Sequence, residues 1–406
     1  MFAPPAFGKI CCNYFTRTCQ MSGKCFIFPP AVLNLPGLLL QDPMSLLPNI
    51  VELQARARAD LRMGVPIVLL GDESAALVAA AETLGDERLA DIRGLGGAPV
   101  LAITPRRAET LKARAYSGHV ARVVLPADVG SGWIQAVADP ADDLKMPMKG
   151  PLQTLRGGDE TLARAAIAFA KAARLLPAAL LLEVGDGPAL AARYGLTCLN
   201  AEAARAVLDE TSPLSPVADA RLPMEAAEAG RLHIFRPEDG AEEHFAIEIG
   251  NPPRDKPVLA RLHSACFTGD VLGSLKCDCG PQLRAALAQM GEQGAGVLLY
   301  LNQEGRGIGL ANKMRAYSLQ DQGFDTVEAN HRLGFEDDER DFRIGAEILR
   351  EMGFSAVRLM TNNPAKVKRM EEHGITVTER VPLKVGHTRF NAHYLATKKR
   401  KSGHLL

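Results

Sequence analysis

The sequence predicts two mixed-sheet domains of the α/β to α+β class. Short apolar runs of strand length alternate with amphipathic helical runs from about residue 46 to residue 210, and the alternation resumes after residue 223. Between the two halves, residues 211–223 contain three prolines, a composition typical of a linker. The length of 406 residues is sufficient for this division.

The first half is expected to begin with a helix. Residues 49–63 have helical apolar spacing, Ser45 or Asn49 is a candidate cap, and Gly64 follows the last apolar position. The elements after it are predicted in this order: a strand at 65–70, a helix at 75–85, a strand at 98–103, a helix that begins at 105, a long helix at 158–176 and a strand at 178–184.

The second half is expected to begin with a hairpin, because two β-like runs at 230–235 and 244–250 flank a polar turn. Asn363 and Pro364 are typical of the cap and the first turn of a helix near the end. The elements between them are predicted in this order: a strand at 257–264, a helix at 281–291, a strand at 296–303, a glycine-rich turn at 304–310, helices at 310–323 and 341–353, a strand at 356–361 and the capped helix at 362–374.

The composition excludes several classes of protein. Hydrophobic residues make up 47% of the chain, and 47 basic side chains balance 47 acidic ones. We therefore expect sizeable cores, and neither a nucleic-acid coat nor a membrane-surface protein. No apolar run approaches the roughly 20 residues that span a bilayer. A cytoplasmic location is the default expectation.

Residues 1–45 are interpreted as a disordered leader or an upstream extension, because they lack clear periodicity and read poorly as a signal peptide. The stretch that begins at Met44, near the end of this segment, resembles the beginning of a domain. The segment holds four of the eight cysteines, which are expected to be thiols or metal ligands rather than disulfides: Cys11, Cys12, Cys19 and Cys25.

Three further cysteines form a compact cluster in the second half. Cys266, Cys277 and Cys279 fall within "HSACFTGDVLGSLKCDCGPQL". Thiolates favour zinc, and three protein ligands leave a fourth position for water, which suits hydrolysis of an amide, an amidine or a ring carbon between two nitrogens. His263 is a candidate fourth ligand, although an extended backbone would turn it away from Cys266. A structural or core role is the alternative.

Two segments are candidate phosphate sites. The run "NQEGRGIGL" at 302–310 places glycines and Arg306 at a strand-to-helix turn, and "TNNPAKVKR" places Thr361 and Lys366 at another. The acidic run 335–342 suits a solvated helix start. A tight turn and a well-capped helix are the simpler interpretations. Together the signals predict a zinc hydrolase acting on a phosphorylated nitrogen heterocycle.

The residues from about 217 to 406 closely resemble GTP cyclohydrolase II. Four stretches carry the resemblance: "RLHSACFTGDVLGSLKCDCGPQL", "YLNQEGRGIGLANKMRAYSLQDQG", "DTVEANHRLGFEDDERDF" and "TNNPAKV". The resemblance implies hydrolysis of GTP to 2,5-diamino-6-(5-phosphoribosylamino)pyrimidin-4(3H)-one, formate and pyrophosphate, the entry step of riboflavin synthesis. It also implies one zinc ion per subunit, magnesium with the triphosphate, and a homodimer.

The same resemblance implies roles for particular residues. Cys266, Cys277 and Cys279 match the zinc ligands, Asp338 the proton acceptor, and Arg340 the nucleophile toward the α-phosphorus or a group that stabilises charge there. Tyr317 matches the tyrosine that accompanies loss of formate. The positions that match GTP contacts are Arg261, Leu262, His263, Ser264, Ala265, Gln282, Glu304, Gly305, Arg306, Thr326, Thr361 and Lys366.

The chain departs from the family pattern at two positions. Ala265 stands where the family commonly has Glu, and Asn302 where it commonly has Arg. Two alternatives are left open, of which the departures support only the first. One is a cyclohydrolase-like enzyme of another pathway, such as pyrimidine catabolism. The other is a non-catalytic zinc-binding regulatory protein.

Residues 46–210 are similar to 3,4-dihydroxy-2-butanone 4-phosphate synthase, on "LRMGVPIVLLGDESAALVAAAE", "ITPRRAETL" and "YGLTCLNAEAARAV". The acidic signature of that family is reduced here to "GDESAALVA", with Asp72 and Glu73, and a later stretch reads "GDET" without its histidine. That synthase needs clustered carboxylates for magnesium and enolisation. We therefore expect a synthase-like domain without synthase activity.

Overall fold

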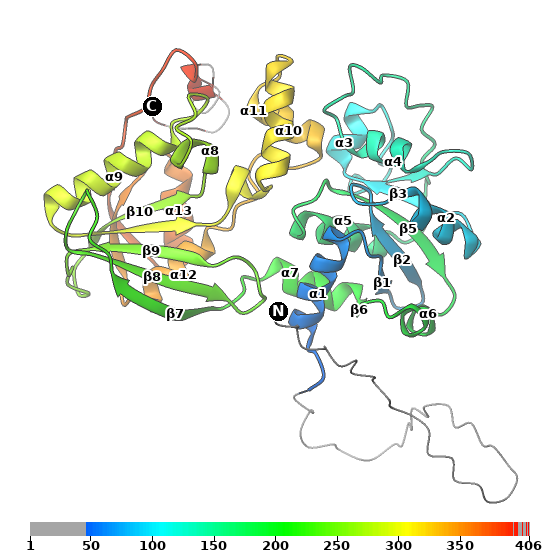
Figure 1. The fold of residues 1–406 in the computed structure, drawn as a ribbon, viewed down its shortest axis with the longest axis horizontal. Helices are drawn as coiled ribbons and strands as arrows, with labels where there is room; N and C mark the ends of the chain where they lie inside the picture. The colour runs from blue at the N-terminus through cyan, green and yellow to red at the C-terminus, as the bar shows by residue number, and fades with distance from the viewer. Residues whose placement is uncertain (1–45, 393, 397–399, 401–402, 404, 406) are drawn as a thin grey trace, which may run out of the picture. The chain divides into compact units, whose positions relative to one another are not determined.

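The computed structural model describes residues 46–392, 394–396, 400, 403 and 405. Residues 48–406 form one compact unit that contains two mixed sheets (Figure 1). The two mixed-sheet domains of the α/β to α+β class are thereby confirmed. The expected leader at 1–45, with its four cysteines and the candidate cap Ser45, lies outside the described residues.

The first sheet has six strands in the order β4-β3-β5-β2-β1-β6. Neighbouring strands are antiparallel except β1 and β6, which are parallel. Helix α1 begins at the predicted cap Asn49, whose side chain and that of Glu52 form a capping box. The elements of this half are α1 (Ile50–Arg62), β1 (Ile67–Leu70), β2 (Ala75–Ala80), α2 (Asp86–Gly94), β3 (Val100–Ile103), α3 (Pro105–Thr110), β4 (Ala121–Val124), α4 (Ser131–Ala138), α5 (Thr161–Ala172), β5 (Ala178–Val184), α6 (Gly187–Tyr194), β6 (Cys198–Asn200) and α7 (Ala201–Asp209).

The helix predicted at 75–85 is wrong. Residues 75–80 form strand β2, which lies between β1 and β5 in the interior of the sheet. Alanine favours helices, and this segment holds several. However, every residue of β2 is buried, and its neighbours on both sides supply backbone hydrogen-bond partners. Packing in the sheet therefore overrides the intrinsic preference of a short apolar run.

The second sheet has seven strands in the order β13-β12-β10-β11-β9-β8-β7. Strands β13, β12, β10 and β11 are parallel to one another, and β9, β8 and β7 continue the sheet as an antiparallel meander. Its elements are β7 (Leu214–Arg221), β8 (Gly230–Pro237), β9 (His244–Ile249), β10 (Val258–Ser264), α8 (Phe267–Asp270), α9 (Cys279–Gln293), β11 (Gly296–Leu301), a 3₁₀ turn (Glu304–Gly307), α10 (Leu310–Asp321), α11 (Thr326–Leu333), α12 (Arg343–Glu351), β12 (Ala356–Met360), α13 (Pro364–Glu372) and β13 (Thr376–Val381).

The segment predicted as a linker, 211–223, instead contains strand β7. This strand pairs with β8 and forms the edge of the second sheet, as Figure 1 shows. An edge strand tolerates proline because one side of it needs no hydrogen-bond partner. Pro216 lies at an irregularity in the register between β7 and β8. The prolines that suggested a linker therefore mark a sheet edge.

Most of the remaining predicted elements are confirmed, including the β8–β9 hairpin, the helix at 161–172 and the strand at 178–184. Asn363 caps α13, and Pro364 is its first residue. The acidic run 335–342 is the connection between α11 and α12 rather than a helix start. Among the described residues, no helix is both long and apolar enough to cross a membrane.

Candidate active site

A cavity of about 300 Å³ opens at the carboxyl ends of the parallel strands β10, β11 and β12. In open sheets with parallel strands, ligands bind at this edge, where loops leave the strand ends. The cavity is lined by every residue that the sequence analysis assigned to the site: Arg261, Leu262, His263, Ser264, Ala265, Cys266, Cys277, Cys279, Gln282, Glu304, Gly305, Arg306, Tyr317, Thr326, Asp338, Arg340, Thr361 and Lys366.

The three cysteines of the second half converge at one end of this cavity. Their sulfur atoms lie within 4.8 Å of one another, and the Cys266 and Cys277 sulfurs are 3.8 Å apart. Tetrahedral zinc with Zn–S bonds of about 2.3 Å requires sulfurs about 3.8 Å apart. The donor set therefore fits zinc. Within the described part of the chain, it is the one group of three or more His, Cys, Asp or Glu side chains with such spacing.

Lys313 of α10 contacts this thiol cluster. Its ammonium nitrogen lies 3.1 Å from the Cys266 sulfur, 2.8 Å from a carboxylate oxygen of Glu304 and 2.9 Å from the hydroxyl of Thr268. Hydrogen bonds from the thiols of Cys277 and Cys279, together with Lys313, hold the pKa of Cys266 far below its ordinary value although burial raises it. The cluster thus favours at least one thiolate, the form that binds metal.

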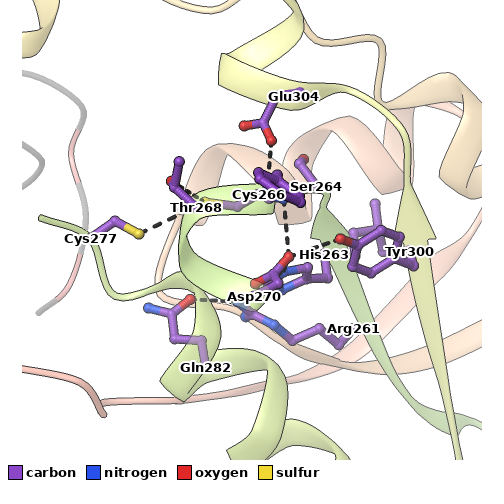
Figure 2. Close-up of polar contacts among 12 residues, drawn as sticks. Arg261, His263, Ser264, Cys266, Thr268, Asp270, Cys277, Gln282, Tyr300 and Glu304 are labelled. Carbon is purple, nitrogen blue, oxygen red and sulfur yellow. Dashed lines mark hydrogen bonds and ion pairs between the residues drawn. The ribbon is translucent and has the colours of Figure 1, made fainter. Parts of the chain in front are cut away.

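Asp270 organises the backbone at the first cysteine (Figure 2). Its buried carboxylate accepts hydrogen bonds from the Cys266 N–H and the Tyr300 hydroxyl, both at 3.0 Å, and contacts Nε2 of His263 at 3.0 Å. The His263 ring also stacks on Tyr300. No ring nitrogen of His263 belongs to the group of metal-spaced ligand atoms that the three cysteine sulfurs form, so among the described residues this histidine does not complete the site as the fourth ligand considered above.

Arg261 lies beneath the cavity with one donor free. Its Nη1 donates to the carbonyl of Met360 at 3.0 Å and its Nη2 to Oε1 of Gln282 at 2.5 Å. Burial lowers the pKa of Arg261 to about 10, so the guanidinium stays charged at neutral pH. Among the described residues, its buried Nε has no hydrogen-bond partner. Figure 2 shows Arg261 and Gln282 joined in this way.

The glycine-rich turn does not present a row of free N–H groups. The Gly305 N–H donates to the Glu304 carboxylate, and those of Gly307 and Gly309 donate to carbonyl oxygens within the same turn. Arg306 has a φ of 64°, a left-handed conformation that costs a non-glycine residue roughly 1–2 kcal/mol. The turn predicted as a phosphate site therefore supplies its backbone shape and the Arg306 side chain, rather than free backbone N–H groups for an anion.

Asp338 and Arg340 form a two-point ion pair. The Arg340 Nε and Nη2 atoms lie 2.8 and 2.7 Å from the two carboxylate oxygens of Asp338, and Nη1 lies 3.3 Å from the Ser264 hydroxyl. Burial raises the pKa of Asp338, but the hydrogen bonds and charge of Arg340 outweigh it, so that pKa lies below its ordinary value. The same pair raises the pKa of Arg340 despite burial. Both groups are charged at neutral pH.

The other predicted phosphate corner lies at the end of β12. Thr361 follows this strand, and its hydroxyl accepts a hydrogen bond from the Asn363 N–H at 3.0 Å. Lys366, in the first turns of α13, donates to the carbonyl of Leu262 at 3.1 Å. Thr326 begins α11 at another wall of the cavity. These positions place cations and hydroxyl groups around one opening, which suits a polyphosphate.

Lys313 and Asp270 were missed by sequence reasoning. Lys313 precedes the predicted site residue Tyr317 by one helical turn on the same face, and this signal was available. The role of Asp270 was hidden, because its partner Tyr300 comes from strand β11, 30 positions further along the chain. The departures also differ in position. Ala265 lines the cavity, whereas Asn302 does not, and its side-chain amide instead donates to the carbonyl of Glu243.

Known proteins are similar to this chain, some over its second half and one over most of its length. A family model described as GTP cyclohydrolase II matches residues 215–382. GTP cyclohydrolase-2 of Azospirillum brasilense is 44% identical over 357 residues, covering 86% of this chain and 93% of that protein. GTP cyclohydrolase-2 of Histophilus somni is 54% identical over 195 residues, covering 48% of this chain and 90% of that protein.

One further relative and one solved structure have related names. A riboflavin biosynthesis protein of Bacillus velezensis is 54% identical over 177 residues, covering 43% of this chain and 44% of that protein. A two-domain 3,4-dihydroxy-2-butanone 4-phosphate synthase from A. baumannii is 18% identical, covers 76% of this chain and 93% of its own, and has a TM-score of 0.30. At that score the structural likeness does not establish the fold of residues 48–210.

Proposed function

Because the chain belongs to the GTP cyclohydrolase II family, we propose that it hydrolyses GTP to 2,5-diamino-6-(5-phosphoribosylamino)pyrimidin-4(3H)-one, formate and pyrophosphate in riboflavin biosynthesis. One observation carries the proposal. The three cysteine sulfurs and the Asp338–Arg340 pair line the same cavity. A group that opens a purine ring and a group that acts at phosphorus are thereby presented to one nucleotide.

Cys266, Cys277 and Cys279 would hold the zinc ion. When bound, zinc activates water at neutral pH and polarises a carbonyl group. Lys313 offsets the negative charge that three thiolates create, and Asp270 fixes the backbone of Cys266. Tyr317 lines the cavity close to Lys313, whose ammonium lies 5.7 Å from the centre of its ring. Burial raises the pKa of Tyr317, so its hydroxyl remains a proton donor for the formyl group.

Arg340 is assigned the triphosphate end of GTP. The raised pKa of its guanidinium favours stabilisation of charge at the α-phosphorus over nucleophilic attack, which would require a deprotonated group. Asp338 orients Arg340 through its two carboxylate oxygens. Magnesium is assigned to the phosphates of GTP, because this ion usually binds proteins through substrate phosphates and few carboxylates.

Residues 46–210 are proposed to lack synthase activity. Asp72 and Glu73 are exposed in the loop between β1 and β2. In the described part of this half, no group of three carboxylate, histidine or cysteine side chains has metal-binding spacing. A homodimer remains a prediction from the family resemblance, and a cytoplasmic location remains the default expectation from the sequence. Formation of dihydroxybutanone phosphate from ribulose 5-phosphate by the purified chain would contradict the first assignment.

The test is turnover by the full chain loaded with zinc. Protein, GTP and magnesium are incubated together, and formate, pyrophosphate and the diaminopyrimidine are measured separately. We expect all three products. Absence of turnover would contradict the proposal and favour a zinc-binding regulatory protein. Turnover of a uracil-derived substrate in place of GTP would favour the alternative that Ala265 suggests.

A further inference from the structure

Helix α10 has two differently occupied faces. Lys313 and Tyr317 line the cavity, whereas Arg315 faces residues of the first sheet's half. The Arg315 guanidinium lies 3.0 Å from a carboxylate oxygen of Glu82 and 2.8 Å from one of Asp139. A helix that lines the cavity is therefore bound by charge to residues 48–210.

An apolar core joins the same segments. Ala316 and Leu319 of α10 and Phe335 after α11 are buried in one cluster with residues of the first sheet. The first-sheet members of this cluster include Leu101, Ile103 and Leu180. Helices α10 and α11, which pack side by side (Figure 1), thus complete their burial only against the other half of the chain.

The loop that carries Asp338 and Arg340 has its own contact with the first half. Lys171 of α5 lies 2.6 Å from the Glu339 carboxylate, and the same oxygen accepts the Glu336 N–H at 2.9 Å. Glu339 stands between the two charged cavity residues in sequence, but it does not line the cavity. Its side chain points to the first half while its neighbours face the site.

The glycine turn holds the opposite side of that loop. The Glu339 N–H donates to the Arg306 carbonyl at 3.0 Å, and Nη1 of Arg306 donates to the Asp337 carbonyl at 3.1 Å. A side chain at Gly307 would approach the Glu339 carbonyl oxygen to 2.7 Å, so the two backbones can be this close only with glycine there. Residue 339 is therefore fixed by its backbone on one side and by Lys171 on the other.

We propose that residues 48–210 position the loop that carries Asp338 and Arg340. Lys171 is the positioning residue, and it acts on this loop through its ion pair with Glu339. The inference rests on the proposed function for its kinetic readout. A misplacement of about 1 Å at a reacting group can cost 100-fold in rate. A partly exposed ion pair, by contrast, contributes little to folding. The side chains of this pair are 25% and 24% exposed, so loop position and overall stability are separable.

The experiment uses the full chain with Lys171→Met, which removes the ammonium and with it both the ion pair to Glu339 and the contact with the Phe335 ring. We expect kcat to fall by roughly 10- to 100-fold, with KM for GTP and the melting temperature nearly unchanged. Lys171→Arg should recover most of the rate. Glu339→Gln should show a similar loss, and the double variant should be no worse than either single variant.

The matched control is Arg106→Met. Arg106 forms a more exposed ion pair with Glu336 of the same loop, at 3.1 Å. The Arg106→Met substitution should leave kcat unchanged. An equal loss in this control, or a wild-type kcat in Lys171→Met, would overturn the proposal. If the wild-type chain does not turn over GTP, hydrogen exchange of residues 335–342 decides instead. Exchange should accelerate in Lys171→Met and not in Arg106→Met, and equal exchange in both would refute the inference.

Discussion

The Lys313 ammonium nitrogen lies 3.1 Å from the Cys266 sulfur. Partners of this kind, outside the ligand set itself, typically contribute 10- to 100-fold to metal affinity. We predict that Lys313→Met weakens zinc retention by at least about 10-fold in a chelator competition, because the charge of three thiolates is then less well balanced. Lys368→Met, at an exposed lysine of α13, is the control. Unchanged zinc affinity in Lys313→Met would contradict this account.

Replacing a thiol of the cluster should separate the two hydrolytic outcomes. Cys277→Ser is expected to lose zinc and to reduce formate release by more than about 100-fold. Loss of a residue that only supports a metal ligand costs up to about 100-fold in activity, and loss of a ligand itself should cost more. Pyrophosphate release should fall less, because Asp338 and Arg340 remain paired. Metal analysis and separate product assays measure both. Cys198→Ser, outside the cluster, is the control, and an equal loss of both products in Cys277→Ser would contradict independent steps.

Arg340→Lys tests the two-point ion pair. Lysine retains the charge but cannot hold both oxygens of Asp338 in the same geometry. We expect pyrophosphate release to slow by about 100-fold, the scale for removal of one charge-stabilising donor, with zinc content unchanged. Arg343→Lys is a close control, because Arg343 binds Asp341 with the same two-residue spacing but does not line the cavity. Similar losses in the two variants would indicate a purely structural role.

His244 should make the stability of the protein depend on pH. Its ring nitrogen Nδ1 accepts the Asn302 N–H at 3.0 Å, and burial, aided by the charge of Arg174, lowers its pKa to about 4. Between this value and the ordinary value near 6.5, the unfolded chain binds more protons, so acidification destabilises the fold. The loss contributed by this group between pH 7 and pH 4 is up to about 3 kcal/mol.

His244→Asn offers an amide oxygen in place of Nδ1 and removes this titration. Denaturant unfolding at pH 7, 5.5 and 4.5 should show a smaller decline for this variant than for the wild type. His119→Asn, at an exposed histidine, should leave the wild-type decline intact. If His244→Asn declines as steeply as the wild type, the buried neutral state of His244 is not responsible.

Much of the fold and the site could be predicted from the sequence because their signals are local. The capped helix at Asn363 and the cysteine spacing lie within short stretches, and the residues assigned to the site meet in one cavity. Strand β2 could not be predicted from alanine-rich sequence, because its burial depends on both neighbouring strands. The Lys171–Glu339 contact joins residues 168 positions apart, so no local pattern could indicate it.

The two faces of α10 also fix its rotation and its register. Successive residues of an α-helix are turned by about 100° and displaced by about 1.5 Å along the axis. A shift by one position would carry Lys313 away from Cys266 and, at the same time, Arg315 away from Glu82 and Asp139. The thiol cluster on one side and Glu82 and Asp139 on the other therefore constrain the same helix, and a displacement that kept one set of contacts would break the other.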